Sequence, residues 1–102
     1  MNTLTTPEVG MGATRHYWTD KRPYTIVKVY SDRCIDVRHC SATCVNDGQD
    51  YGQNWDIEEV ESNPSIKVTL RKNGRWHQVG ESMASGSYFT IGERRMYHDW
   101  SF

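Results

Sequence analysis

The sequence lacks the features that direct a chain to a membrane or to an oxidising compartment. No run of apolar residues approaches the length that spans a bilayer. Residues 1–7 have neither the basic start nor the apolar stretch of a secretory signal. Only three cysteines are present in 102 residues, and an odd number favours free thiols in a reducing cytosol. We therefore expect a cytoplasmic protein of one domain.

Motifs for catalysis are also missing. The chain has no nucleophile motif, no metal-hydrolase motif and no glycine-rich phosphate loop before a helix. Asp20 stands beside Lys21 and Arg22, but nothing near it suggests the burial that shifts a pKa, so a solvated turn is expected there. The sequence predicts no catalytic residue and no cofactor.

The net charge of −1 is too small for a general attraction to nucleic acid or membranes. Its distribution is more informative, because residues 46–64 carry acids without any Lys or Arg, and residues 65–80 carry bases without any acid. The acids are Asp47, Asp50, Asp56, Glu58, Glu59 and Glu61, and the bases are Lys67, Arg71, Lys72 and Arg75. Either neighbouring strands attract each other, or the basic half receives an anionic ligand.

No segment has three turns of helical periodicity, and short alternating runs are separated by frequent turn signals. This pattern predicts an all-β fold with little or no helix, as a small SH3-like barrel or a compact meander sandwich. We expect a flexible tail at residues 1–9 and one domain at 10–102. Strands are predicted at 13–18, 24–30, 34–40, 54–61, 66–79 (as a hairpin), 87–91 and 93–100, with a long polar loop at 41–52. The predicted core is Ile26 or Val27, Val29, Ile35, Val37, Val68, Leu70 and Ile91.

Asn73-Gly74 lies in the middle of that hairpin and predicts a two-residue type I′ turn. In this register Lys72 faces Arg75, Arg71 faces Trp76, Leu70 faces His77, and Val68 faces Val79. One face would be aliphatic, with Ile66, Val68, Leu70 and Val79. The other face would expose Lys67, Arg71 and Trp76.

Cys34, His39, Cys40 and Cys44 are the one cluster that resembles a zinc site. Their spacing is poor, because Cys34 and Cys40 lie along one predicted strand and His39 points to its opposite face. We expect no metal and thiols that are buried or half-buried.

Arginine beside aromatic rings can stack on a base and hold a phosphate. The predicted binding residues are therefore Lys67, Arg71, Arg75 and Trp76, helped by Arg15 and Arg94 if their strands are adjacent. The alternative is that the tryptophans fill the core and their cationic neighbours are solvated. The apolar end of the chain, residues 97–102, is expected to pack onto Trp18 or Tyr24.

Several segments resemble a family of small, poorly characterised proteins of bacteriophages and prophages. They are residues 12–14, 18–20, 24–27, 70–76 with the Arg-Lys-Asn-Gly-Arg-Trp hairpin, and the end at 91–102 with its Tyr-x-Asp-x-Ser-Phe motif. The resemblance spans residues 9–102 and is weakest at 40–63. These relatives have Tyr or Asp in place of His98 or Trp100 and fewer cysteines, which argues against a metal or catalytic role for the cysteines of this chain.

The resemblance implies an anti-defence protein that acts in the host cytoplasm by binding, without catalysis. Its partner would be a host defence protein, as for an anti-CRISPR inhibitor, or a nucleotide second messenger that it sequesters; no membrane is implied. The low net charge disfavours a DNA-mimic inhibitor. Two other roles stay open: a small nucleic-acid-binding accessory module that uses the basic and aromatic hairpin face, and a structural piece of a virion.

Overall fold

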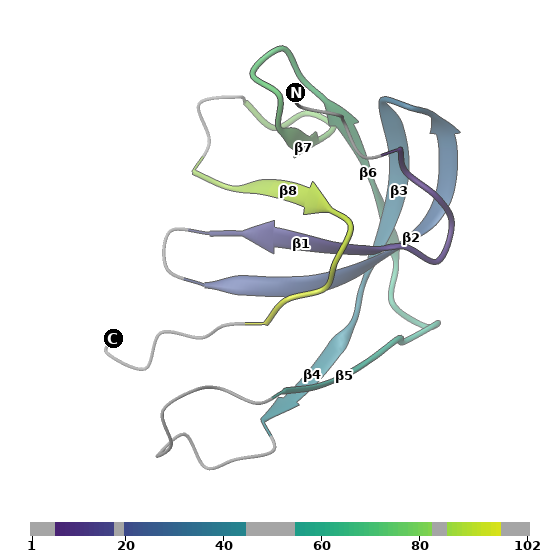
Figure 1. Ribbon diagram of the computed structural model, residues 1–102, viewed down its shortest axis with the longest axis vertical. Helices are drawn as coiled ribbons and strands as arrows, with labels where there is room; N and C mark the ends of the chain where they lie inside the picture. The colour runs from purple at the N-terminus through teal and green to yellow at the C-terminus, as the bar shows by residue number, and fades with distance from the viewer. Residues whose placement is uncertain (1–5, 18–19, 45–54, 83–85, 97–102) are drawn as a thin grey trace.

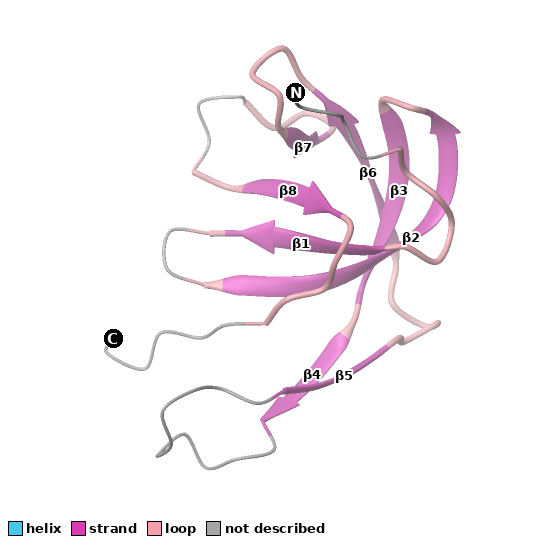
Figure 2. Cartoon of the chain, in the orientation of Figure 1, coloured by secondary structure: helices cyan, strands magenta, loops and turns pink. Residues whose placement is uncertain are grey.

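The computed structural model describes residues 6–17, 20–44, 55–82 and 86–96, and these residues contain strands and no helix (Figure 2). Six antiparallel strands close a barrel in the order β1-β2-β3-β6-β7-β8 (Figure 1). The strands are β1 (Gly12–His16), β2 (Lys21–Ser31), β3 (Cys34–His39), β4 (Ser41–Cys44), β5 (Trp55–Glu58), β6 (Ser65–Leu70), β7 (Trp76–Gln78) and β8 (Tyr88–Ile91). The prediction of a small all-β barrel is confirmed. Nowhere in the described part is there a helix long and apolar enough to cross a membrane.

The barrel is a meander with one insertion. Strands β4 and β5 pair only with each other and form a hairpin that extends away from the barrel between β3 and β6 (Figure 1). The strand predicted at 54–61 is confirmed in its centre, whereas residues 41–44 form β4 where a loop was predicted. Ala42 pairs with Ile57 there, and this cross-strand partner stabilises the β4 segment despite its polar neighbours.

The core contains most of the side chains that alternation predicted. Ile26, Ile35, Val37 and Val68 are fully buried, and Val29, Leu70 and Ile91 pack against them while partly exposed. Four further buried side chains, Ala13, Tyr24, Trp76 and Phe89, complete the same cluster. Val79 was predicted on the aliphatic face, and that prediction is wrong, since 52% of Val79 is exposed.

The β6–β7 turn has a different register from the predicted one. The Arg71 amide donates to the Arg75 carbonyl at 2.9 Å and the Gly74 amide donates to the Arg71 carbonyl at 3.0 Å, which makes a three-residue loop. Gly74 has a φ of +80°, and positive φ is confined to glycines among the described residues, so Asn73 does not form a type I′ turn. Leu70 therefore pairs with Trp76. This one-residue shift turns the Trp76 side chain inward, where it is only 6% exposed.

A strand was predicted at 93–100, and for residues 93–96, the part that the structure describes, this prediction is wrong. These residues cross β1 and β2 instead of pairing with them (Figure 1). The Thr14 hydroxyl donates to the Glu93 carbonyl, and the Arg95 amide donates to that hydroxyl. Arg94 donates to the Thr25 hydroxyl at 2.9 Å. Thr14 and Thr25 are consequently buried on the outside of the barrel. Residues 97–102 and the expected partner Trp18 lie outside the described residues.

Candidate ligand-binding site

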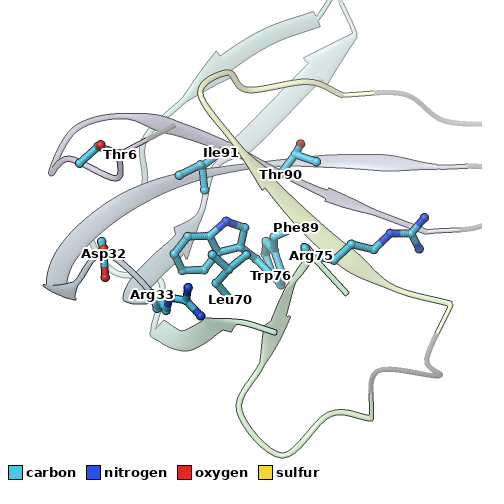
Figure 3. Close-up of a pocket in the computed structure, with 10 residues that line it drawn as sticks. Thr6, Asp32, Arg33, Leu70, Arg75, Trp76, Phe89, Thr90 and Ile91 are labelled. Carbon is cyan, nitrogen blue, oxygen red and sulfur yellow. The ribbon is translucent and has the colours of Figure 1, made fainter. Parts of the chain in front are cut away.

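A pocket of about 310 Å³ opens at the end of the barrel where the β2–β3 and β6–β7 turns lie. Its apolar lining comes from four side chains, and six further residues form its polar wall and rim (Figure 3). The apolar residues are Leu70, Trp76, Phe89 and Ile91, and the others are Thr6, Asp32, Arg33, Gly74, Arg75 and Thr90. The size lies at the lower end of the range of small-molecule sites.

Local structure explains how these residues meet. The three-residue β6–β7 loop turns Trp76 inward, and Trp76 pairs with Phe89 across β7 and β8. The Leu70 amide donates to the Arg33 carbonyl at 2.9 Å, which fixes the β2–β3 turn against the end of β6. The segment before β1 supplies Thr6, and the adjacent Pro7 is buried.

Three polar groups at the pocket have no hydrogen-bond or ion-pair partner among the described residues. They are the Trp76 indole N–H, the Arg33 guanidinium and the Asp32 carboxylate. In Figure 3 the Arg33 guanidinium lies beside Leu70 and the Trp76 ring, and Asp32 lies on the same side of the pocket. Asp32 and Arg33 are exposed residues at the rim, beside the apolar lining, where polar groups can orient a ligand.

A row of basic and aromatic side chains continues from the rim across the outside of the barrel. Lys21, His16 and Tyr88 stand opposite one another on β2, β1 and β8. The His16 and Tyr88 rings stack with centroids 4.8 Å apart, and Arg75 lies over the Tyr88 ring at 4.2 Å. Arg95 is next to this row, since its amide bonds Thr14 two residues before His16. We call Lys21, His16, Tyr88, Arg75 and Arg95 the basic strip.

The charges of the basic strip affect His16. Burial is the main reason why its pKa is below the ordinary value, and the cations Lys21, Arg95 and Arg75 lower it further. His16 is thus held in its neutral form and shares a hydrogen bond of 2.8 Å with the Thr90 hydroxyl. Arg75 and Thr90 also line the pocket, so the pocket and the strip are continuous.

Of the six residues predicted to bind, the structure brings Arg75 and Trp76 to the pocket. The prediction that Trp76 is exposed is wrong, although its indole still lines the cavity. Lys67 lies elsewhere, with its Nζ 4.6 Å from the Tyr30 ring centroid. Arg71 is held by the Thr69 hydroxyl and by the carbonyls of Gln78 and Glu81.

Arg15 and Arg94 also have structural partners. Arg15 bonds Ser87 and forms an ion pair with Glu81 at 3.1 Å, beside the β7–β8 connection. Arg94 donates to Thr25 and to the Gly10 carbonyl. The six predicted residues therefore do not form one face, because the register shift and these internal hydrogen bonds separate them.

Sequence reasoning missed Arg33, Asp32, Phe89 and Ile91 as pocket residues and Lys21, His16 and Tyr88 in the basic strip. A turn sequence such as Ser31-Asp32-Arg33 does not tell which strand end it covers. The proximity of His16 to Tyr88 depends on the closure of β8 onto β1, which no local pattern encodes.

The cysteines and the charge blocks have simpler environments. Cys40 is buried and its thiol lies 3.1 Å from the Thr25 hydroxyl, and Cys34 is half-buried. The described residues contain no cluster of three or more potential metal ligands. The acidic strand β5 pairs with β4 rather than with the basic β6, and within the described ranges no ion pair joins the two charge blocks.

No protein-family model matches this chain, and no curated protein or solved structure matches it significantly.

Proposed function

We propose that this protein is a non-catalytic binding protein whose barrel-end pocket takes a nucleotide. The observation that carries the proposal is the pocket of about 310 Å³, in which an indole ring and three aliphatic or aromatic side chains are accompanied by an unpartnered guanidinium. A base would stack on the Trp76 ring, which lines the pocket. Aromatic stacking of this kind contributes about 1–3 kcal/mol per base.

The polar rim supports a nucleotide rather than an uncharged aromatic molecule. Arg33 would hold the phosphate, because a guanidinium matches the geometry of phosphate oxygens and Arg33 has no competing partner in the described residues. Asp32 would accept a hydrogen bond from a ribose hydroxyl. The carboxylate also repels a phosphate, so the proposal places the phosphate on the Arg33 side.

The resemblance to phage proteins connects this pocket with a biological role. Of the partners that the resemblance implies, a nucleotide second messenger fits a pocket of this size, whereas an inhibitor of a defence protein would use a broader surface. We propose that the protein sequesters such a nucleotide in the host cytoplasm. Arg33→Ala should then abolish protection of a phage in a host-defence assay, while Lys28→Ala, which removes a charge from β2 outside the pocket lining, should preserve it.

Calorimetric titration with the four nucleoside monophosphates and their nucleosides tests the binding itself. Removing the phosphate should weaken binding at least tenfold, as the loss of a charge-assisted hydrogen bond of about 1.5–3 kcal/mol implies. In Arg33→Ala the nucleotide and nucleoside should bind equally, and Lys28→Ala should behave as the unmodified protein. If nucleotide and nucleoside bind the unmodified protein equally well, or neither binds at millimolar concentration, the proposal is wrong.

A further inference from the structure

The basic strip begins at the pocket rim, because Arg75 lines the pocket and His16 bonds Thr90, which also lines it. From these features we infer that the protein takes a further ligand, a single-stranded nucleic acid, with one nucleotide in the pocket and the following phosphates along the basic strip. This inference rests on the proposed function, because the pocket receives a nucleotide in both cases, and it extends the ligands from a free nucleotide to a short strand. A free mononucleotide would leave the Lys21 ammonium without a partner among the described residues.

The geometry of the strip fits a chain of phosphates. Lys21, His16 and Tyr88 are directly opposed on three neighbouring strands, and Arg75 precedes β7, the next strand. Since neighbouring strands are about 4.8 Å apart, this row extends roughly 14 Å across the barrel. It also runs perpendicular to the strands, so successive cations come from different strands rather than from one flexible loop. Such a length suits several phosphates and exceeds what one phosphate group can contact.

Ring contacts hold the hydrogen-bond donors of Arg75 in place before a ligand binds. The Tyr88 ring contacts both the His16 ring and the Arg75 guanidinium, which limits the rotamers that Arg75 adopts. The guanidinium of Arg75 and the ammonium of Lys21 make no hydrogen bond or ion pair within the described part of the chain. Their donors are thus available, and less conformational entropy is lost when they bind an anion.

Acidic side chains near the strip are few among the described residues. Glu93 pairs with Arg95 on the surface, where both are more than half exposed. Asp20 precedes Lys21 but pairs with Arg22, whose side chain lies on the other face of β2. The strip therefore keeps a local positive charge although the whole chain has a net charge of −1. A local strip on a neutral protein favours a short contact with one strand over general adhesion to nucleic acid.

The salt dependence of octanucleotide binding gives the test. Single-stranded binding that neutralises four phosphates, one with Arg33 at the pocket and three with Lys21, Arg75 and Arg95, should give a slope of about −3 for log K against log salt concentration. Calorimetry with oligouridylate of eight residues and with uridine monophosphate, at three salt concentrations, measures both ligands. We expect the octamer to bind at least tenfold more tightly than the monophosphate.

Two variants that each lose one lysine charge test whether the salt dependence of octamer binding comes from the basic strip. Lys21→Ala should weaken octamer binding and reduce the slope by about 0.7. Lys28→Ala removes the same charge from the same strand, outside the strip, and should change neither quantity. Circular dichroism of both variants checks that they fold.

The possible outcomes separate this inference from the proposed function. If the monophosphate and the octamer bind equally, and Lys21→Ala changes neither, the pocket function stands and the inference is overturned. If only the octamer binds, with a slope that depends on Lys21, single strands bind along the strip without a nucleotide in the pocket, and both the pocket function and this inference are overturned. If neither ligand binds, or if Lys28→Ala lowers the slope as much as Lys21→Ala, the inference is overturned.

Discussion

Arg71 illustrates how single side chains build the open end of the barrel. Its guanidinium donates to Thr69 on β6 and to the Gln78 and Glu81 carbonyls that follow β7. These bonds hold the β7–β8 connection close to β6, and the Gln78 carbonyl also accepts the Glu81 amide there. An arginine in this position is a structural crosslink, which is why the pocket has Arg33 rather than Arg71 as its available cation.

Gly74 allows the three-residue turn that places Trp76 in the pocket. Its φ of +80° lies in the left-handed region, where an L side chain costs about 1–2 kcal/mol. A Cβ at this position would meet no atom within 4 Å, so strain and not a clash decides the result. Gly74→Ala should lower the free energy of unfolding by about that amount in urea denaturation. Gly74→Asn is the control and should lose less, because Asn tolerates this conformation. Equal losses for both variants would contradict this explanation.

His16 should make the protein less stable in mild acid. Burial and then Lys21, Arg95 and Arg75 lower the pKa of His16, so the folded state resists a proton that the unfolded chain accepts below about pH 6.5. The stability contributed by neutral His16 is present above that pH and is lost as the pH falls towards the folded pKa. Urea midpoints measured between about pH 7.5 and 5.5 should fall, and the fall should be smaller in His16→Gln.

His39 requires a separate control in that experiment. Burial and Arg22 lower its pKa as well, so it contributes with the same sign. His39→Gln should remove its own share only, and the double variant should show the smallest dependence on pH. A fall as large in His16→Gln as in the unmodified protein would mean that folding does not lower the pKa of His16.

At the scale of elements, strands were predictable and their registers were not. Alternation in residues 65–70 correctly identified β6, because Val68 and Leu70 face the core. Asn73-Gly74 accepts either a two-residue or a three-residue loop, and one added residue reverses the face of Trp76. Burial of a large indole stabilises the second register, and this tertiary contribution is absent from the local pattern.

The segment after β8 depends on a close approach to β1. A Cβ on Gly12 would lie 2.7 Å from the Arg94 Cγ and 2.8 Å from the Arg94 backbone nitrogen. Gly12→Ala should therefore displace residues 93–95 and destabilise the fold by about 1–3 kcal/mol, as overpacking does. The thermal midpoint measures this loss. Gly10→Ala does not serve as a control, because Gly10 has positive φ. The comparison is Ala13→Gly on the same strand, which measures the stability lost when apolar area is removed from β1.

At the scale of the whole molecule, the pocket exists because the barrel is closed by elements that are distant in sequence. Thr6, the β2–β3 turn, the β6–β7 turn and the end of β8 meet at one end of the barrel. The fold class was predictable because each strand carries its own alternation. The site was not, since its members share no motif and meet only after β8 pairs with β1. Arg75 and Trp76 line the pocket, and their role in binding stays a prediction.

Ligand binding at that end should stabilise the entire barrel, because the pocket joins its first and last described segments. A ligand that binds only the folded state adds about 2.7 kcal/mol at a concentration one hundred times its Kd. For a domain of this size, that is expected to raise the thermal midpoint by roughly ten degrees or more. Arg33→Ala should unfold at an unchanged temperature without ligand, since the Arg33 guanidinium has no partner among the described residues. At the same nucleotide concentration its midpoint should rise much less. An equal rise in both proteins would mean that the nucleotide does not contact Arg33 and does not bind in the pocket.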